Sequence, residues 1–441
     1  MQITIHKWSD LDGAARSRLL SRSEQKIEAL VGTVSQIVHA VRMRGDEALR
    51  DFTARFDEAD LGDLPLRVTP AEFEEGVGNV PHDVRSAIDY AIENVRRTHE
   101  RQRPPTFQME ETRPGIRTGE RAIPLQSVGL YVPRGRGSFP SMLYMLALPA
   151  RIAGVDRVAV ATPPDQHGKI DAACLYAARA CGVQEVYRVG GAQAVAAFAY
   201  GTESIPRVDK IVGPGSAYVA AAKRVVRDVV DVGIPAGPSE SMIVADSHSD
   251  AMTVSRDLLI EAEHGADSQA LLVTTNHELA AQVAADLPDL IAGTPEPRRA
   301  FLTAVFREYG GVIIANDLTE AANIVNEFAP EHLQLRLADP EPFIDQIRNA
   351  GEILLGPHTP FSLANYAVGP NAVLPTGGGA RVHSGVSVND FVKRVAVMQV
   401  TAEGYAEIAP HVIRLADYEG FYWHAQALRD RDTNQEKNRD E

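Results

Sequence analysis

The sequence predicts an α/β protein whose parallel sheets are covered by helices. From residue 127 onward, short apolar segments typical of buried strands alternate with segments whose apolar residues recur at every third or fourth position, as on one face of a helix. This alternation favours parallel strands, and it places ligands beyond the carboxyl ends of the strands. We infer two such α/β units, which meet near the glycine-rich stretch 233–237.

Nine segments are candidates for strands and four for the helices between them. Most are bounded by glycine, proline, aspartate or asparagine, which open turns. The strand candidates are SVGLYV (127–132), DRVAVATP (156–163), EVYRVGG (185–191), DKIVGPG (209–215), ESMIVAD (240–246), QALLVTT (269–275), GGVIIAN (310–316), HLQLRL (332–337) and EILLG (352–356). The helix candidates are PSMLYMLALPARIAG (140–154), GAQAVAAFAYG (191–201), SAYVAAAKRVVRDVV (216–230) and SDAMTVSRDLLIEAEHG (249–265).

The rest of the chain does not show this alternation of strands and helices. Residues 8–60 and 81–101 are predicted to be helical from the same periodicity. The segment 101–126 is rich in proline and charge, and we expect it to carry the chain into a new domain. After Thr376 come a glycine-rich stretch, a helical segment and a polar tail, of which residues 429–441 are predicted to be disordered.

Composition argues against several classes of protein. The 441-residue chain has a net charge of −15 and no basic cluster, so a nucleic-acid partner is not expected. No apolar run approaches the roughly 20 residues that span a membrane, and the N-terminal residues lack the pattern of a signal peptide. Cys174 and Cys181 suit buried helix positions better than a disulfide, which indicates a cytoplasmic protein.

Two pairs of residues could carry chemistry. Glu261 and His264 are three apart at the end of a helix, so both could face one metal ion, although such pairs are also common on solvated helix faces. Glu331 and His332 fall where a helix ends and a strand begins. An adjacent carboxylate and imidazole suit acid–base work, and a loop Glu beside a backbone-bonded His is the structural alternative.

Two further places are weaker candidates. Asn365 lies in a polar segment, 361–372, and its oxygen could bind a metal or cap a turn. Glu419 and His424 lie on a predicted C-terminal helix, where an isolated His is usually a surface residue.

Glycine motifs suggest binding without the usual fingerprint. The dinucleotide pattern G-x-G-x-x-G is absent after the first strand. GGAQA from Gly190 and GPGSA from Gly213 each follow a strand and open a helix, so their N–H groups could receive phosphate or carboxylate, or the glycines could serve only the turns. No nucleophile elbow is present, and neither cysteine lies in a strand-end loop.

The order of these segments resembles the histidinol dehydrogenase family over nearly the whole chain. The matching motifs are GLYVPRG, MLALPARIAGV, GGAQAVAAFAYGTESIPRVDKIVGPG, AGPSE, EAEHGADSQ, NEFAPEHLQL, NYAVGPNAVLPT and SGVSVNDFVKR. The resemblance implies two incomplete Rossmann-like domains, an N-terminal helical arm and a C-terminal helical tail exchanged in a homodimer. It places the arm at 1–30, a metal and catalytic domain at 31–130 with 241–380, an NAD-binding domain at 131–240 and the tail at 381–441.

The resemblance also gathers the weak candidates into one site shared between subunits. The family's zinc ligands fall on Glu261, His264 and Asn365, with His424 of the partner subunit. Its catalysts fall on Glu331 and His332. The nicotinamide contacts fall on Tyr131, Gln193 and Ser216, and the substrate contacts on Ser239 and Glu419.

Several positions depart from the family pattern. Glu261 replaces Gln and Asn365 replaces Asp, an exchange that keeps the ligand count and formal charge which a divalent ion requires. Ala372 replaces a substrate-contacting His. Two other positions differ from the family pattern by a positively charged or titratable side chain. They are Arg134, whose loop also contains Arg136, and His383.

The arginines and His383 favour an anionic substrate. Arginine suits forked binding of carboxylate or sulfonate oxygens. Two observations stand against this: the arginines could be solvated loop residues, and the retained Glu419 would repel an anion.

The resemblance implies zinc-dependent, NAD-linked oxidation of a primary alcohol through an aldehyde to a carboxylate. Zinc would orient the substrate and polarise its oxygen, His332 would take the hydroxyl proton, and Glu331 would activate water for the hydration step. The chain also resembles the sulfopropanediol 3-dehydrogenase branch of this family, whose members oxidise 2,3-dihydroxypropane-1-sulfonate to sulfolactate. The resemblance therefore implies a small anionic diol of this kind as the substrate. Histidinol, giving histidine, is the alternative substrate, and a zinc hydrolase or an inactive metal-binding scaffold are the alternatives from other classes.

Overall fold

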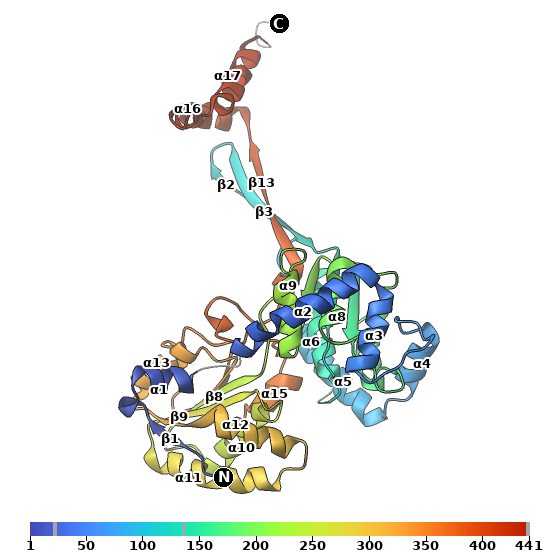
Figure 1. Cartoon of the computed structure of the whole chain (residues 1–441). Coiled ribbons are helices and arrows are strands. Elements are labelled where there is room, and N and C mark those ends of the chain that lie inside the picture. Colours follow the sequence, from blue (N-terminus) through green and yellow to red (C-terminus); the bar gives the residue numbers. More distant parts are fainter. Residues whose placement is uncertain (21–23, 135–136, 438–441) are drawn as a thin grey trace. The chain divides into compact units, whose positions relative to one another are not determined.

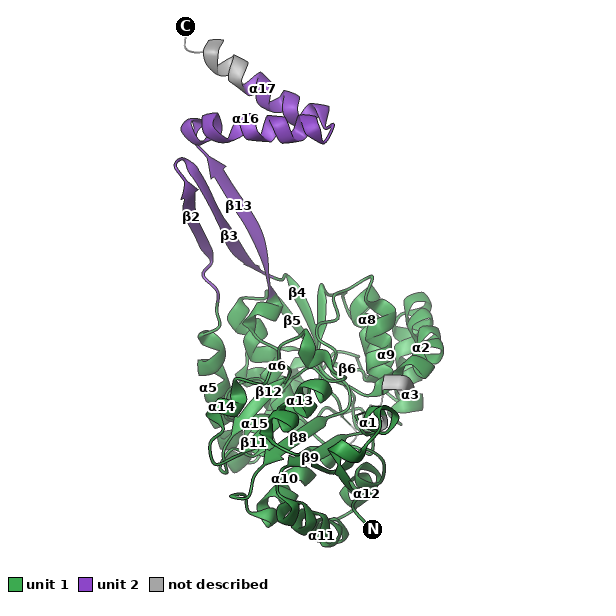
Figure 2. Ribbon diagram, turned by 90° about the vertical axis from the view of Figure 1, so that its left-hand side faces the viewer, with its two compact units in different colours: residues 1–103, 125–391 green, residues 104–124, 392–441 purple. Residues whose placement is uncertain are grey.

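The computed structural model describes residues 1–20, 24–134 and 137–437, and Figure 1 labels most of its helices and strands. The described chain divides into two compact units, residues 1–103 with 125–391 and residues 104–124 with 392–441, which are coloured separately in Figure 2. The first unit contains two parallel sheets, and the second contains an antiparallel sheet and two helices.

A six-stranded parallel sheet is built from the second half of the first unit and the N-terminal residues. Its order is β1 (Ile5–Lys7), β10 (Gly310–Ile314), β9 (Gln269–Thr274), β8 (Glu240–Ala245), β11 (His332–Arg336) and β12 (Glu352–Leu355). One face packs on α10 (Ala251–Ala262), α11 (His277–Gly293) and α12 (Arg298–Glu308), and the other on α13 (Leu318–Phe328). Because both faces are covered, the central strands are buried throughout and mostly apolar.

A four-stranded parallel sheet follows the same logic. Its order is β6 (Glu185–Arg188), β5 (Arg157–Thr162), β4 (Ser127–Tyr131) and β7 (Lys210–Val212). The helices between and after its strands are α6 (Pro140–Ala153), α7 (Ala172–Ala180), α8 (Gly191–Tyr200) and α9 (Ala217–Val226). Against them pack α2 (Glu24–Arg44), α3 (Asp46–Phe56), α4 (Pro70–Gly78) and α5 (His82–Glu100).

Short elements complete the first unit. They are the helices α1 (Gly13–Leu19), α14 (Glu341–Ile344) and α15 (Phe361–Tyr366) and the 3₁₀ turns η1 (Trp8–Asp10), η2 (Gly379–Arg381) and η3 (Val388–Phe391).

The second unit pairs two segments that are far apart in the sequence. The strands β2 (Phe107–Arg113), β3 (Ile116–Pro124) and β13 (Val392–Val400) form an antiparallel sheet with β3 in the centre. The helices α16 (Ala402–Tyr418) and α17 (Tyr422–Lys437) follow and pack on each other, and Tyr405 Oη donates to the Leu428 carbonyl over 2.7 Å. Several large apolar side chains in this unit are exposed, including Tyr418 and Trp423.

The α/β prediction is confirmed, and each of the nine strand candidates is a strand of a parallel sheet. The two sheets divide between β7 and β8, on either side of the glycine-rich stretch 233–237, as expected. Both cysteines are buried and free. None of the helices in the described ranges is long and apolar enough to cross a membrane.

The structure differs from the expectations in three ways. The N-terminal arm begins with β1, which extends the six-stranded sheet. Most of residues 31–103 pack with the four-stranded sheet rather than with 241–380, because the apolar faces of α2 and α3 meet those of α8 and α9. The segment 101–126, expected as a connection, contains the whole β2–β3 hairpin. Residues 429–437, expected to be disordered, belong to the helix α17, and residues 438–441 lie outside the described chain.

Candidate active site

Glu331 and His332 stand at a sharp change from helix to strand. The helix α13 ends at Phe328, after which Ala329 takes a left-handed conformation (φ 53°) and Pro330 has no N–H to continue the helix. His332 is then the first residue of β11. Both side chains are buried, and Glu331 Oε2 accepts a hydrogen bond of 3.0 Å from the Glu240 backbone N–H.

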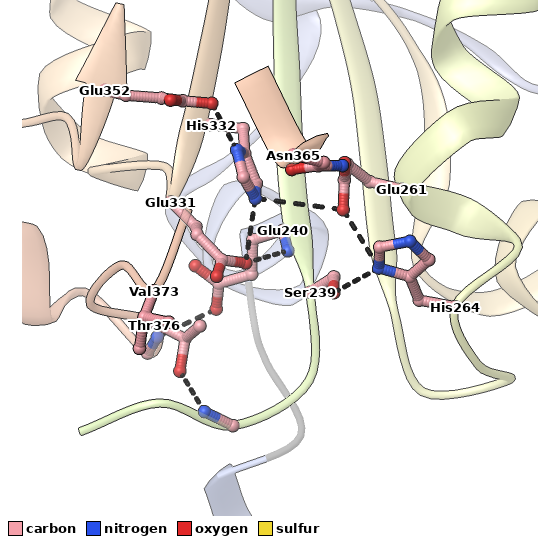
Figure 3. Close-up of polar contacts among 12 residues, drawn as sticks. Ser239, Glu240, Glu261, His264, Glu331, His332, Glu352, Asn365, Val373 and Thr376 are labelled. Carbon is pink, nitrogen blue, oxygen red and sulfur yellow. Dashed lines mark hydrogen bonds and ion pairs between the residues drawn. The ribbon is translucent and has the colours of Figure 1, made fainter. Parts of the chain in front are cut away.

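The imidazole of His332 lies between three carboxylates, as Figure 3 shows. Its Nδ1 is 2.6 Å from Glu352 Oε1, and its Nε2 is 3.7 Å from Glu331 Oε2 and 3.8 Å from Glu261 Oε2. Burial opposes a charge on the ring, but the carboxylates outweigh burial and raise the pKa of His332. Burial raises the pKa of Glu331, against the opposing effect of His332.

The expected metal ligands of this chain come together beside His332. Glu261 Oε2 is 3.1 Å from His264 Nδ1, and Asn365 Nδ2 donates to Glu261 Oε1 over 2.5 Å. Ser239 Oγ is 2.9 Å from the same His264 nitrogen. The local structure differs from the prediction, because α10 ends at Ala262, before His264, and because Asn365 belongs to the short helix α15 rather than to a loop.

These residues fit a divalent cation. Glu261 Oε2 is buried, and its nearest polar neighbours are the ring nitrogens of two histidines, His264 Nδ1 at 3.1 Å and His332 Nε2 at 3.8 Å. Burial would raise the pKa of Glu261, but His264 and His332 lower it below the ordinary value, so the group remains a carboxylate. Carboxylate oxygen, imidazole nitrogen and amide oxygen form a donor set that zinc accepts.

The set needs a further ligand. Within residues 1–20, 24–134 and 137–437, no group of three or more His, Cys, Asp or Glu side chains is placed to hold a metal. Glu261, His264 and Asn365 would supply three ligands, and the fourth position of a tetrahedral zinc site would be open to water, to substrate or to a further side chain.

The site lies at the amino ends of the strands, which corrects the expectation for this unit. Glu240, His332 and Glu352 are the first residues of β8, β11 and β12. The helices α10 and α13 end at this edge, and the partial negative charge at a helix C-terminus favours a cation there. At the carboxyl ends of parallel strands a ligand meets helix N-termini, which favour anions. The amino edge is therefore the opposite case.

The expected nicotinamide contacts do follow the carboxyl-end rule in the four-stranded sheet. Tyr131 ends β4, and its hydroxyl accepts a hydrogen bond of 3.1 Å from the N–H of Gly191, the first residue of α8. Gly191 has a φ of 59°, and a Cβ there would lie 2.7 Å from Gln193 Oε1. Ser216 caps α9, in a loop where Gly213 approaches the Tyr131 carbonyl too closely for a Cβ.

Gln193 supports a bound group at this edge. Its side chain is buried, and neither its Oε1 nor its Nε2 has a partner in the part of the chain that the structure describes. A buried amide without partners is costly, so the carboxamide of a nicotinamide would fit this position. The residues therefore fit a dinucleotide cofactor.

The remaining predicted residues lie apart from this cluster or outside its unit. Burial raises the pKa of Asp57 and of Cys174, and the charge of Arg134 partly offsets this rise at both side chains. His383 is exposed and lines a cavity of about 280 Å³, together with Glu240 and Lys223. Glu419 and His424 belong to the second unit, at the end of α16 and on α17. Arg136 lies outside the described residues.

Three buried or half-buried acids were missed by the sequence analysis. Glu240 and Glu352 each begin an otherwise apolar strand, ESMIVAD and EILLG, and this charged first residue was the available signal. Asp57 follows α3, and a Cβ on Gly190 would lie 3.1 Å from its Oδ1. Asp57 lies near the start of α8 because distant segments of the chain pack together, and the residues around Asp57 in the sequence do not predict this packing.

Comparisons with known proteins agree with this geometry. The sequence model described as histidinol dehydrogenase matches residues 20–432. The chain is 46% identical to a histidinol dehydrogenase of Synechocystis sp. over 97% of its length and 99% of that protein. It is also 46% identical to a protein of Mesorhizobium japonicum named histidinol dehydrogenase homolog 2, over 97% of each chain. The chain belongs to the histidinol dehydrogenase family.

A solved structure supports the same assignment. The crystal structure of histidinol dehydrogenase from Elizabethkingia anophelis superimposes with a TM-score of 0.92 and 33% sequence identity, covering 99% of both chains. The family consists of NAD-dependent oxidoreductases that act on a CH–OH group in two steps.

Proposed function

We propose that this member of the histidinol dehydrogenase family oxidises a small anionic diol, such as 2,3-dihydroxypropane-1-sulfonate, to the carboxylate. The observation that carries the chemistry is the buried pair Glu331 and His332, in which His332 Nε2 lies within 4 Å of Glu331 Oε2 and of Glu261 Oε2. Few positions in a protein hold a buried base next to a donor set for a cation, and such positions serve catalysis.

The metal would be held by Glu261, His264 and Asn365, with His424 of the partner subunit as the fourth ligand in a homodimer. Within the described chain the first three supply one carboxylate, one imidazole and one amide oxygen. When bound, Zn²⁺ supplies Lewis-acid polarisation of the substrate oxygen, and NAD accepts the hydride in each of the two steps.

The chain's own residues would move the protons. His332 Nε2 faces Glu331 and Glu261 and would take the proton of the substrate hydroxyl. Glu331 would activate the water that hydrates the aldehyde, since its carboxylate is held in place by the Glu240 N–H. Tyr131, Gln193 and Ser216 would position the nicotinamide.

The anionic substrate rests on the residues that differ from the family pattern. Arg134 follows β4 at the edge where the cofactor contacts gather, and His383 lines the cavity next to Glu240. Either could approach the acidic group of a bound substrate, while Ser239 and Glu419 would contact its hydroxyls.

Histidinol remains a second candidate substrate because a relative that is 46% identical over 97% of this chain carries the name histidinol dehydrogenase. Glu419, which would attract a cationic substrate, favours this candidate as well.

The deciding experiment measures NADH formation by the purified, zinc-loaded protein with both alcohols side by side. We expect turnover of the sulfonate with two NADH per substrate, and loss of activity after chelation that zinc restores. Turnover of histidinol alone would overturn the anionic substrate and leave the family chemistry intact. Activity without NAD would favour a zinc hydrolase.

A further inference from the structure

A carboxylate from a neighbouring strand is bonded to the imidazole of His332. His332 and Glu352 are the first residues of β11 and β12, which are adjacent and parallel, and they are direct partners in the register. Their side chains therefore leave the sheet on the same face and at the same level. The distance from His332 Nδ1 to Glu352 Oε1 is 2.6 Å, and the side chains are 3% and 11% exposed.

The backbone holds this pair together. The Gly351 N–H donates to the Pro330 carbonyl over 2.9 Å, and the Glu352 N–H donates to the Glu331 carbonyl over 3.1 Å. A Cβ on Gly351 would lie only 2.5 Å from the Glu331 carbonyl oxygen, so glycine permits this close approach. Both strands begin side by side, and the two side chains have little freedom to separate.

The two ring nitrogens of His332 consequently have different surroundings. Nδ1 is committed to Glu352, while Nε2 faces Glu331 and Glu261 (Figure 3). A neutral imidazole carries one proton, and a carboxylate at Nδ1 accepts that proton's hydrogen bond. Nε2 is then left with its lone pair directed at the site.

We propose that Glu352 is a positioning residue that orients the His332 ring and fixes its tautomer, so that Nε2 is the atom that exchanges protons with substrate. The proposal deepens the proposed function, on which it rests. Glu352 also faces the positive charge that forms when Nε2 takes a proton from the hydroxyl, and burial strengthens that attraction. This is the role of the Asp in a Ser-His-Asp triad, here filled by a Glu from the next strand.

The test compares Glu352→Gln and Glu352→Asp with the wild-type protein. The Gln side chain keeps the shape and loses the charge, so we expect kcat to fall about 10²–10⁴-fold while KM and the Kd for NADH stay within about twofold. The Asp variant restores the charge and should recover part of kcat. Equal kcat for the Gln variant and the wild type would overturn the proposal.

The matched control is Glu185→Gln. Glu185 is also the first residue of a parallel strand, β6, is 17% exposed, and is paired with Arg157 in the other sheet. Its loss should lower the unfolding midpoint and leave kcat within about twofold. A fall in kcat for Glu185→Gln equal to that for Glu352→Gln would assign Glu352 a purely structural role.

Two further readouts separate this proposal from the choice of substrate. Both alcohols are assayed, because a wild-type protein that oxidises histidinol alone would overturn the anionic substrate and still give the kcat ratio for Glu352. Crystal structures of the wild type and the Glu352→Gln variant report the orientation of the His332 ring without any substrate. A rotated ring in the variant supports the proposal, and an unchanged ring together with unchanged kcat contradicts it.

Discussion

Ionisable groups in the site are buried together and balance one another. Burial alone would neutralise Glu261, yet two imidazoles keep its pKa low. Burial alone would also discharge His332, yet three carboxylates raise its pKa. The charges of these groups are therefore coupled, and removing one of them changes the behaviour of the others.

Glu331→Gln should separate the two oxidation steps. The amide keeps the shape and the Glu240 hydrogen bond but cannot accept a proton from water. We expect the first hydride transfer to continue and the second to slow by about 10²–10⁴-fold, so that one NADH per substrate forms instead of two. Quantifying NADH and released aldehyde checks this outcome. Two NADH per substrate at the wild-type rate would mean that another group activates the water.

Asp57 makes stability depend on pH. Burial raises its pKa from an ordinary value of 3.8 to about 6, against the opposing effect of Arg134. The folded state thus holds this proton more tightly than the unfolded state does. The stability that the proton confers is complete below about pH 4 and is lost as pH rises through 6.

Asp57→Asn should remove this dependence. The amide is neutral at every pH, so the variant should gain about 1–2 kcal/mol relative to the wild type between pH 5 and pH 7.5, after allowance for partial exposure. Urea unfolding at both pH values measures the difference. Asp63→Asn changes an exposed carboxylate nearby and should give no such gain. An equal gain in the two variants would contradict the prediction.

At the level of elements, one helix and one strand set the site's geometry. Asp257 and Glu261 lie one turn apart on α10, and His332 and Gln334 lie on one face of β11. Asp257 Oδ2 accepts from Gln334 Nε2 over 2.9 Å and is 3.3 Å from Arg336 Nη1. This buried contact lies next to the Glu261–His332 contact and fixes how α10 is placed along β11.

Asp257→Ala should loosen the metal site as well as the fold. Removing one partner of a buried pair leaves Arg336 uncompensated, so we expect a loss of about 3 kcal/mol in the free energy of unfolding and weaker zinc binding. Competition with a chromophoric chelator measures zinc affinity. Asp250→Ala is the control, because it removes the N-cap of the same helix at a cost of about 1 kcal/mol without touching β11. Equal loss of zinc affinity in both variants would argue against a specific role for the contact.

The sequence predicts those helices and strands that show as a pattern of apolar residues close together in the chain. The nine parallel strands that the sequence predicts are mostly apolar because helices cover the sheets, and such runs are visible in the sequence. The strands β2 and β13 are mostly exposed, so their residues show no apolar alternation, and the hairpin of β2 and β3 was missed. The site's position at the amino edge was missed for a related reason, since the direction in which helices end at a sheet depends on topology.

At the scale of the whole molecule, family resemblance supplied what local patterns could not. Glu261 and Asn365 are more than 100 residues apart and meet only in the fold. Glu352 escaped notice because the resemblance carried no role for it and its contact with His332 depends on strand register. The described first unit provides three candidate ligands, and the fourth, His424, belongs to the second unit, so the complete site is a property of the assembly that we propose.

Mixing two inactive variants tests the shared site. If His424 of one subunit completes the metal site of its partner, His424→Ala and Glu331→Gln damage different chains of the same active site. In a mixed dimer one site would carry both changes and the other neither. Half of randomly reassociated dimers are mixed, so we expect recovery of about a quarter of the wild-type rate. The rate to measure is that of complete oxidation to the acid, after mild dissociation and reassociation of the subunits. At this rate each variant alone should be inactive. Failure to recover activity, although mass spectrometry shows mixed dimers, would place His424 in the site of its own chain or outside the site altogether.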